Sequence, residues 1–389
     1  MLLNDLSKHL SDKFSLENPC YELDENVVCY TFNFISDVSF HNHDHCEQLN
    51  INTDGTQLDN GEKENQNFRY AVFAPVKNRL FSEAIIMLHG LNERKWEKYL
   101  PWAYQLVLQT QKPVILFPIA YHINRSPLTW ICPRLMNKFS IFRKTSAPAA
   151  ENSTFANVAL SLRLDRRPQL FALSGIQTYF DIIKLTTDIR AGHIEIFDRQ
   201  CHIDFFAYSI GALLTETLLI SNPLQLFSDS KAFFFCGGST FDKINGSSRA
   251  IMDHQAFDHL HNYVLHHTEI QEKEIKIPKN YAYLLKDGWK AFLAMSGMKK
   301  FINDRDEAFQ RLINRIKAIG LKGDFVVPGT AIKETFGKVF NNACFDVEVM
   351  DFPFKYSHET PFPMNIPKIN DSVSHSFQTV FRQASLFLS

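Results

Sequence analysis

Short apolar segments that alternate with helix-like stretches constrain the fold of this chain more than any other feature. The clearest are Ala84-Ile85-Ile86-Met87-Leu88 and Pro113-Val114-Ile115-Leu116-Phe117. Further strands are predicted at 201–206, 231–236, 316–321 and 345–351, and helices at 95–110, 174–192, 211–221, 330–340 and 371–388. A strand that is apolar on both sides needs cover on both faces, as in a parallel sheet. Alternation with helices therefore predicts an α/β fold with a mostly parallel central sheet flanked by helices.

The first part of the chain has a different pattern. Residues 26–36 alternate between apolar and polar positions and predict a strand, and residues 68–76 predict a second one; we expect these two strands to lie antiparallel at the edge of the sheet. We expect residues 1–66 to be an N-terminal extension with an edge strand and a polar loop, followed by one large domain over 67–389. Two stretches exceed a minimal core: 120–173, which looks long and irregular, and 241–310, which looks mostly helical. Both are expected to form a cap above the sheet.

Composition excludes some classes of protein. Lysine and arginine number 41 against 42 acidic residues, so no basic excess favours a nucleic-acid partner. The seven cysteines are scattered without a C-x-x-C pair, which is typical of reduced thiols. No apolar run approaches the roughly 18 residues of a membrane span, and the N-terminus lacks a signal-peptide core. We expect a cytoplasmic protein without a membrane contact. A homo-oligomer is left open.

One serine lies between small residues at a predicted strand-to-helix turn, in Ala207-Tyr208-Ser209-Ile210-Gly211. A tight turn there would hold the serine in a strained conformation and lift its hydroxyl above the sheet. Ala207 stands where the G-x-S-x-G pattern has its first glycine, so the match is weaker than the full motif. The pentapeptide alone fits equally well a serine that caps the following helix.

Three more features follow predicted strands. His89-Gly90 ends the strand 84–88, and a sharp turn there would expose the amide of Leu91, which together with the amide of Ile210 could bind an oxyanion. Asp324 follows the strand 316–321, and His358 follows the strand 345–351. The carboxyl ends of parallel strands meet at one edge, where ligands bind. Each feature also has a structural explanation: His89-Gly90 could be an ordinary turn, Asp324 a helix cap and His358 a solvated loop residue.

In chain order, these features resemble the α/β-hydrolase superfamily from about residue 67 to the C-terminus. The stretch 117–127 also resembles an uncharacterised bacterial family within it that carries F-P-I-A-x-H-x-N-R-S-P. The resemblance implies Ser209 as nucleophile, His358 as general base and Asp324 as the acid that orients it. Asp242, after the strand 231–236, is a rival acid.

The resulting hypothesis is a serine hydrolase that cleaves a small-molecule carboxylic ester through an acyl-enzyme and needs no cofactor. A peptidase, thioesterase or acyltransferase would use the same residues, and a catalytically inactive binding protein could keep the same fold. No glycine pattern for nucleotide binding is present.

Two other groups of residues contain side chains that could carry chemistry. The stretch 41–46, HNHDHC, is the best metal candidate, but its spacing and context are wrong, so we expect no metal site. His122, Asn124 and Arg125 follow a strand closely enough to reach a site. Arg125 could pair with an anionic group of a substrate, but a role in tying down the insertion is the favoured interpretation.

Overall fold

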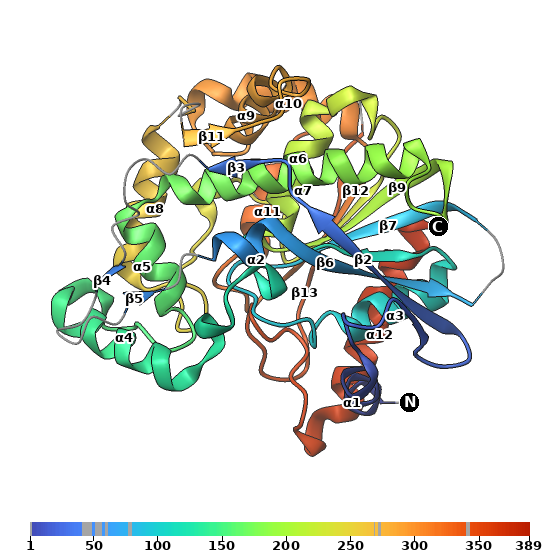
Figure 1. Ribbon diagram of the computed structural model, residues 1–389, viewed down its shortest axis with the longest axis horizontal. Coiled ribbons are helices and arrows are strands. Elements are labelled where there is room, and N and C mark those ends of the chain that lie inside the picture. The colour runs from blue at the N-terminus through green and yellow to red at the C-terminus, as the bar shows by residue number, and fades with distance from the viewer. Residues whose placement is uncertain are drawn as a thin grey trace.

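A nine-stranded sheet forms the centre of the computed structural model (Figure 1). The structure describes residues 2–40, 49–50, 57–58, 61–76, 80–267, 269–270, 274–339 and 343–389. In spatial order the strands are β1 (Cys20–Glu22), β2 (Val27–Ile35), β6 (Asn67–Pro75), β8 (Val114–Leu116), β7 (Phe81–Leu88), β9 (Phe197–Tyr208), β10 (Ala232–Phe235), β12 (Ile316–Leu321) and β13 (Asp346–Met350).

The strands divide into two groups by direction. From β8 to β13 every neighbouring pair is parallel, whereas β1, β2 and β6 pair antiparallel at the other edge. The crossed order of β7 and β8, with β6 antiparallel beside them, is that of an α/β-hydrolase fold. This confirms the predicted fold class, including the antiparallel strands at the edge.

Helices cover both faces of the sheet (Figure 1). One face carries α1 (Leu3–Lys13), α3 (Leu100–Thr110) and α12 (Asn370–Leu388); the other carries α6 (Gln169–Ala191), α7 (Ile210–Ser221) and α11 (Gly329–Phe336). Alternate residues of one strand enter different cores, since Ile85 and Met87 face α3 while Ile86 and Leu88 face α7. This two-sided burial explains why the β7 sequence is apolar without interruption.

The sequence predicted an irregular stretch over 120–173, and the structure contradicts this prediction. This stretch contains α4 (Pro133–Ser146) and α5 (Val158–Arg166), and α6 begins at Gln169 rather than at the predicted position 174. Its prolines do not interrupt these helices, because Pro133 occupies the first turn of α4 and Pro168 the N-cap of α6, where proline is tolerated. Ser174 is not a cap: its hydroxyl donates to the Leu170 carbonyl within α6.

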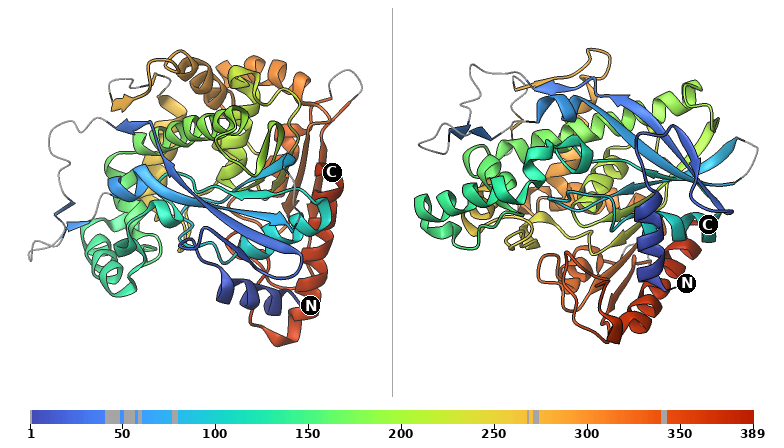
Figure 2. Two further views of the ribbon diagram at one scale, coloured as in Figure 1. Left: turned by 45° about the vertical axis from the view of Figure 1, so that its right-hand side comes forward. Right: turned by 60° about the horizontal axis from the view of Figure 1, so that its bottom comes forward.

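The remaining α-helices and strands lie in two parts of the chain, residues 39–66 and residues 254–312. They are α2 (Glu62–Gln66), α8 (His254–His266), α9 (Leu284–Ala294), α10 (Ile302–Leu312), β3 (Ser39–Phe40), β4 (Leu49–Asn50), β5 (Gln57–Leu58) and β11 (Ile275–Lys276). Within the second insertion, α8 packs on α5, whereas α9 and α10 pack beside α7. The views in Figure 2 show α1 lying against α12 near the two termini.

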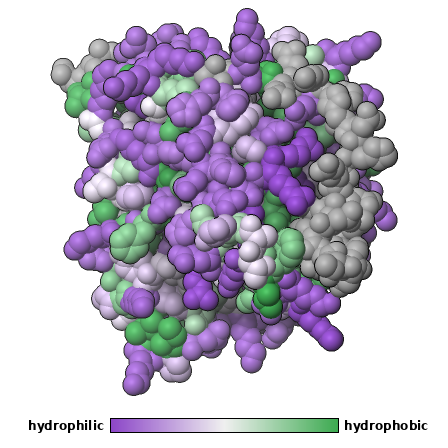
Figure 3. Space-filling model, turned by 90° about the vertical axis from the view of Figure 1, so that its left-hand side faces the viewer, coloured by the Kyte–Doolittle hydropathy of each residue, from purple (hydrophilic) through white to green (hydrophobic). Residues whose placement is uncertain are grey.

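Arg143 joins the helices of the two insertions. Its guanidinium donates two hydrogen bonds to Asp253 at 2.8 and 2.9 Å and one to Asp165 at 2.6 Å. Asp253 in turn caps α8 by accepting the amide of Ala256. The helices α4, α5 and α8 therefore form one layer, which we call the cap. The outer surface on this side of the molecule is largely hydrophilic (Figure 3).

Candidate active site

Ser209 lies at the turn between β9 and α7. Its backbone has φ 55° and ψ −121°, which an L-residue adopts only under strain. Its side chain makes no capping bond to α7 and instead lies 2.7 Å from Nε2 of His358, measured from Oγ. The hydroxyl is directed at an imidazole rather than at the helix, so the structure disagrees with the alternative of a simple helix cap.

His358 lies between Ser209 and Asp324. Its Nδ1 is 2.7 Å from Oδ2 of Asp324, and both side chains are buried, at 3% and 0% exposure. Because a carboxylate only accepts, Nδ1 carries the proton of the neutral ring and Nε2 is left to accept from the Ser209 hydroxyl. The histidine is therefore not a solvated loop residue.

The carboxylate of Asp324 is also fixed from its other side. Oδ1 accepts the amides of Val326 and Val327, both at 2.9 Å, so the aspartate closes its own turn rather than capping α11. The rival acid, Asp242, lies elsewhere: its carboxylate packs against Gly297, where an added Cβ would be 1.9 Å from Oδ1. The structure brings Asp324 to His358 and leaves Asp242 apart.

The loop after β7 is shaped by His89. The amide of Ile119 donates to its Nε2 at 2.9 Å, so its Nδ1 carries the proton and donates to the Gly90 carbonyl at 2.9 Å. Burial, and secondarily the charge of His122, lower the pKa of His89 well below its ordinary value, which keeps the ring neutral. A bond to the Gly90 carbonyl fixes the peptide whose other end is the Leu91 amide.

The backbone amides of Leu91 and Ile210 are free to donate a hydrogen bond to a ligand. Neither donates to an acceptor among the residues that the structure describes. Gly211 permits the close approach of α7 to β7, since a Cβ there would lie 2.7 Å from the Leu88 carbonyl oxygen. Gly237, at the end of β10, is equally constrained, since its Cβ would lie 2.8 Å from the Ser209 carbonyl oxygen. The sequence analysis missed Gly237.

The sequence analysis also missed two side chains that support the histidine. The hydroxyl of Tyr208 donates to the His358 carbonyl, and the Tyr208 ring stacks on the imidazole with centroids 5.3 Å apart. The ammonium of Lys98 lies 4.7 Å from the centre of the Tyr208 ring and donates to the Glu359 carbonyl at 3.3 Å. The Tyr208 position was visible as the residue before the candidate serine, but a sequence pattern does not show where its ring points.

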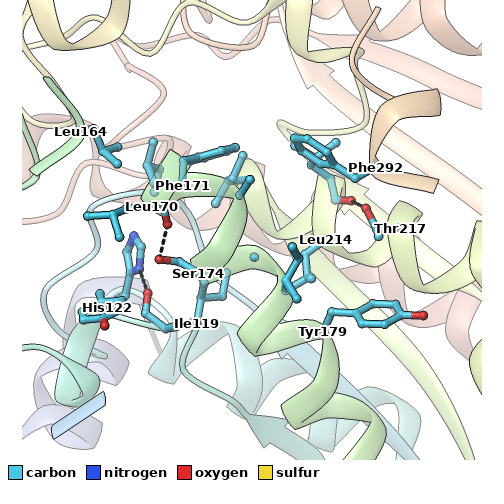
Figure 4. Close-up of a pocket in the computed structure, with 18 of the residues that line it drawn as sticks. Ile119, His122, Leu164, Leu170, Phe171, Ser174, Tyr179, Leu214, Thr217 and Phe292 are labelled. Atoms are coloured by element: carbon cyan, nitrogen blue, oxygen red, sulfur yellow. Dashed lines mark hydrogen bonds between the residues drawn. The ribbon is translucent and has the colours of Figure 1, made fainter. Parts of the chain in front are cut away.

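An apolar cavity is lined by residues of the loop after β7 and of α7, and Figure 4 shows a close-up of it. Its lining includes Leu91, which follows Gly90, and Ile210, which follows Ser209; a Cβ at Gly90 would lie 3.4 Å from the Cβ of Ser209. The cavity then continues between α6, α7 and α9, and residues of α5 also line it. His122 and Ile119 lie at one end of the view, and Tyr179 and Thr217 lie at the other.

His122 and Arg125 have different surroundings. His122 lines the cavity; its Nδ1 lies 2.8 Å from the Ala120 carbonyl oxygen, and its buried Nε2 has no partner among the described residues. Burial lowers the pKa of His122 to about 4. Arg125 is fully buried and donates to the carbonyls of Asn65 and Pro118 and to Asp181. It ties the insertion to α6 and does not line the cavity.

The metal candidate at 41–46 lies outside the described residues. Within the parts of the chain that the structure describes, no three His, Cys, Asp or Glu side chains gather as a ligand set. In the same described residues, no helix combines the length and the apolar character needed to cross a bilayer.

Sequence comparison places the chain in a family. The model of a family of unknown function, DUF6051, matches residues 9–389. The chain belongs to DUF6051. No curated protein matches this DUF6051 sequence.

Solved structures resemble this DUF6051 protein at low identity. Carboxyl esterase 2 from the fungus Tuber melanosporum is 10% identical with a TM-score of 0.46, covering 98% of this chain and 97% of that one. A thermostable esterase from Pseudomonas putida is 7% identical with a TM-score of 0.40, covering 99% and 88%. A cold-adapted esterase from an Arctic intertidal metagenomic library is 10% identical with a TM-score of 0.38, covering 95% and 99%. The geometry around Ser209 stands independently of these distant likenesses.

Proposed function

We propose that this protein is a serine hydrolase that cleaves carboxylic esters, with Ser209 as nucleophile, His358 as general base and Asp324 as the acid that orients it. One observation carries the proposal: a single buried imidazole bonds the serine hydroxyl through Nε2 and a carboxylate through Nδ1. A hydroxyl is activated at neutral pH when it bonds to a base that is held in turn by an orienting carboxylate, and these three side chains make those two contacts.

The first half of the reaction forms an acyl-enzyme. As Ser209 Oγ attacks the ester carbonyl carbon, its proton passes to Nε2 of His358, and Asp324 stabilises the imidazolium that results. The carbonyl oxygen becomes negative in the tetrahedral intermediate and accepts hydrogen bonds from the amides of Leu91 and Ile210, which have no acceptor among the described residues. Collapse of the intermediate breaks the bond to the alcohol, which leaves with the proton from Nε2.

The second half releases the acid. A water molecule gives a proton to Nε2 and attacks the acyl carbon, and the same two amides again stabilise the oxyanion. Collapse then returns the proton from Nε2 to Ser209 Oγ. The strained backbone of Ser209 supports this role, because strain of this kind is retained where it positions a reacting group.

Covalent labelling tests the proposal directly. A fluorophosphonate probe should add once to the folded wild-type protein, as seen by intact mass, and should not add to Ser209→Ala. Ser174→Ala is the matched control, because Ser174 also lines the cavity while its hydroxyl bonds only its own helix. It should label like the wild type. Labelling that persists in Ser209→Ala, or that is absent from folded wild type, would refute the proposal.

A further inference from the structure

The cavity that begins beside Ser209 follows α7 into the protein. Four side chains of α7 line it, at the spacing i, i+3, i+4 and i+7: Ile210, Leu213, Leu214 and Thr217. These positions form one face of a helix, and the distance from first to last is about 10 Å at 1.5 Å per residue. The cavity is thus a channel about two helical turns long that starts at the proposed oxyanion site.

Aromatic side chains line the end of the channel that lies opposite His122 (Figure 4). Tyr179 of α6 lines it and is held by a 3.1 Å hydrogen bond between its hydroxyl and Ser221. Gly288 of α9 lies directly against it, since a Cβ there would be 3.0 Å from the Tyr179 ring, and Trp289 lines the same region. A hydrocarbon chain that enters beside Ser209 would therefore meet the rings of Tyr179 and Trp289.

The hydroxyl groups of Ser174 and Thr217 along the channel are already hydrogen-bonded within their own helices. Ser174 donates to the Leu170 carbonyl at 2.6 Å, and Thr217 donates to the Leu213 carbonyl at 2.9 Å. Both hydroxyls donate their proton to a backbone carbonyl, so neither can donate a hydrogen bond to a molecule in the channel. The other side chains of α7 and α9 at the wall are aliphatic or aromatic, which favours an occupant that is a hydrocarbon chain.

We propose that this channel binds the acyl chain of the ester and that α7 limits its length to a medium chain, close to octanoyl. An extended chain with C–C bonds of about 1.5 Å advances about 1.25 Å per bond, so about eight bonds match the channel. The inference rests on the proposed function, because it assigns the acyl side of the ester that Ser209 would attack.

A series of p-nitrophenyl esters from acetyl to palmitoyl tests the length. For the wild type we expect kcat/KM to rise about threefold to fourfold with each methylene up to octanoyl, because each buried methylene strengthens binding in the transition state. It should then fall at least about tenfold for palmitoyl, which exceeds the channel. A profile that peaks at acetyl, or that stays level to palmitoyl, would overturn the assignment.

Two substitutions at different depths test whether α7 is the measuring element. Leu214→Trp narrows the channel about 6 Å from its start, so the preferred ester should shorten to butyryl. Thr217→Trp obstructs only the far end, so the preference should shorten less, to hexanoyl. The readout for both variants is the shift of the preferred chain length relative to the wild type, and hydrolysis of the acetyl ester shows that Ser209 is still active. Ile220→Trp is the control, since Ile220 lies on α7 outside the lining and should leave the profile unchanged.

Fluorophosphonate labelling of each variant separates the two proposals. Intact labelling of Ser209 with an unchanged chain-length profile would overturn the acyl channel and leave the serine hydrolase standing. No labelling and no hydrolysis of any ester by the wild type would overturn both. If a tryptophan variant does not fold, as seen by circular dichroism, the wild-type series alone decides the length.

Discussion

The ring of Tyr208 stacks on the imidazole of His358, at an interplanar angle of 20°, while its hydroxyl donates to the carbonyl of the same histidine. One residue therefore holds both the ring and the backbone of the proposed base. Burial raises the pKa of Tyr208 well above its ordinary value, so its hydroxyl stays protonated and remains a donor. Tyr208 directly precedes Ser209, which couples the position of the base to that of the nucleophile.

Tyr208→Phe should lower kcat/KM about fivefold to tenfold, because it removes this hydrogen bond while keeping the stacked ring. Activity on a short ester and the rate of fluorophosphonate labelling should fall together. Tyr104→Phe is the control: it removes a hydroxyl bonded to Asp24 in another part of the fold. It should cost similar stability and leave kcat/KM unchanged. Equal activity in the two variants would remove Tyr208 from its positioning role.

Asp324→Asn should lower kcat about ten-thousandfold while leaving the protein folded. The asparagine oxygen can still accept the amides of Val326 and Val327, so the turn is kept. The amide nitrogen would then face Nδ1 of His358 and favour the wrong tautomer. The measurement is ester hydrolysis alongside thermal unfolding. Asp242→Asn should have wild-type activity, and a large loss there would instead favour the rival acid.

His122 should make the protein less stable in mild acid. The unfolded chain protonates this histidine near pH 6.5, whereas the folded protein does so only near pH 4. Between these values the unfolded state binds more protons, so the free energy of unfolding falls with falling pH, by about 1.4 kcal/mol per pH unit for one group. Urea unfolding at several pH values should therefore show a shallower acid loss in His122→Gln. His193→Gln, at a largely exposed site, should retain the wild-type slope.

Glu216 should lower the stability of the protein as pH rises, whereas His122 lowers it as pH falls. It is fully buried in α7, and neither carboxylate oxygen has a partner among the described residues. Burial raises its pKa well above the ordinary value, so the folded state keeps a proton that the unfolded state loses above about pH 4.5. Stability is therefore lost as pH rises from there toward the folded pKa.

Glu216→Gln removes this titration, so its stability relative to the wild type should grow between pH 5 and pH 8. Urea unfolding at both pH values provides the measurement. Glu307→Gln, at an exposed position, should show no such growth. A constant difference between Glu216→Gln and wild type would show that the carboxyl is ionised in the folded protein.

Arg125→Met should destabilise the protein by about 3–5 kcal/mol, because it leaves the buried carboxylate of Asp181 without its cation. Chemical denaturation measures the loss, and the activity per folded molecule should be retained. Arg69→Met is the comparison, since the Glu17 partner of Arg69 is largely exposed, and it should cost less than about 1 kcal/mol. A loss of activity without a loss of stability in Arg125→Met would give this arginine a role at the site.

The sequence predicted the sheet well because its signals are local. The apolar run 84–88, the strand 316–321 and the last helix from about 371 were found within a few residues of their observed bounds. It predicted the first insertion poorly, since 120–173 looked irregular although Pro133 and Pro168 stand at helix starts, whereas the mostly helical second insertion was predicted correctly. Proline disrupts the interior of a helix but is tolerated in its first turn, and the sequence alone does not show which of these positions a proline occupies.

By itself, the sequence determined the order of strands and helices, and with it the meeting of Ser209, Asp324 and His358 at one edge of a parallel sheet, because that edge collects every loop after a strand. Only the tertiary structure decided which aspartate faces the histidine, since Asp324 and Asp242 both follow a strand and differ only in where their loops run. It also decided the placement of Tyr208 on His358 and the channel between α6, α7 and α9. These depend on the packing of side chains distant in sequence, which no local pattern encodes.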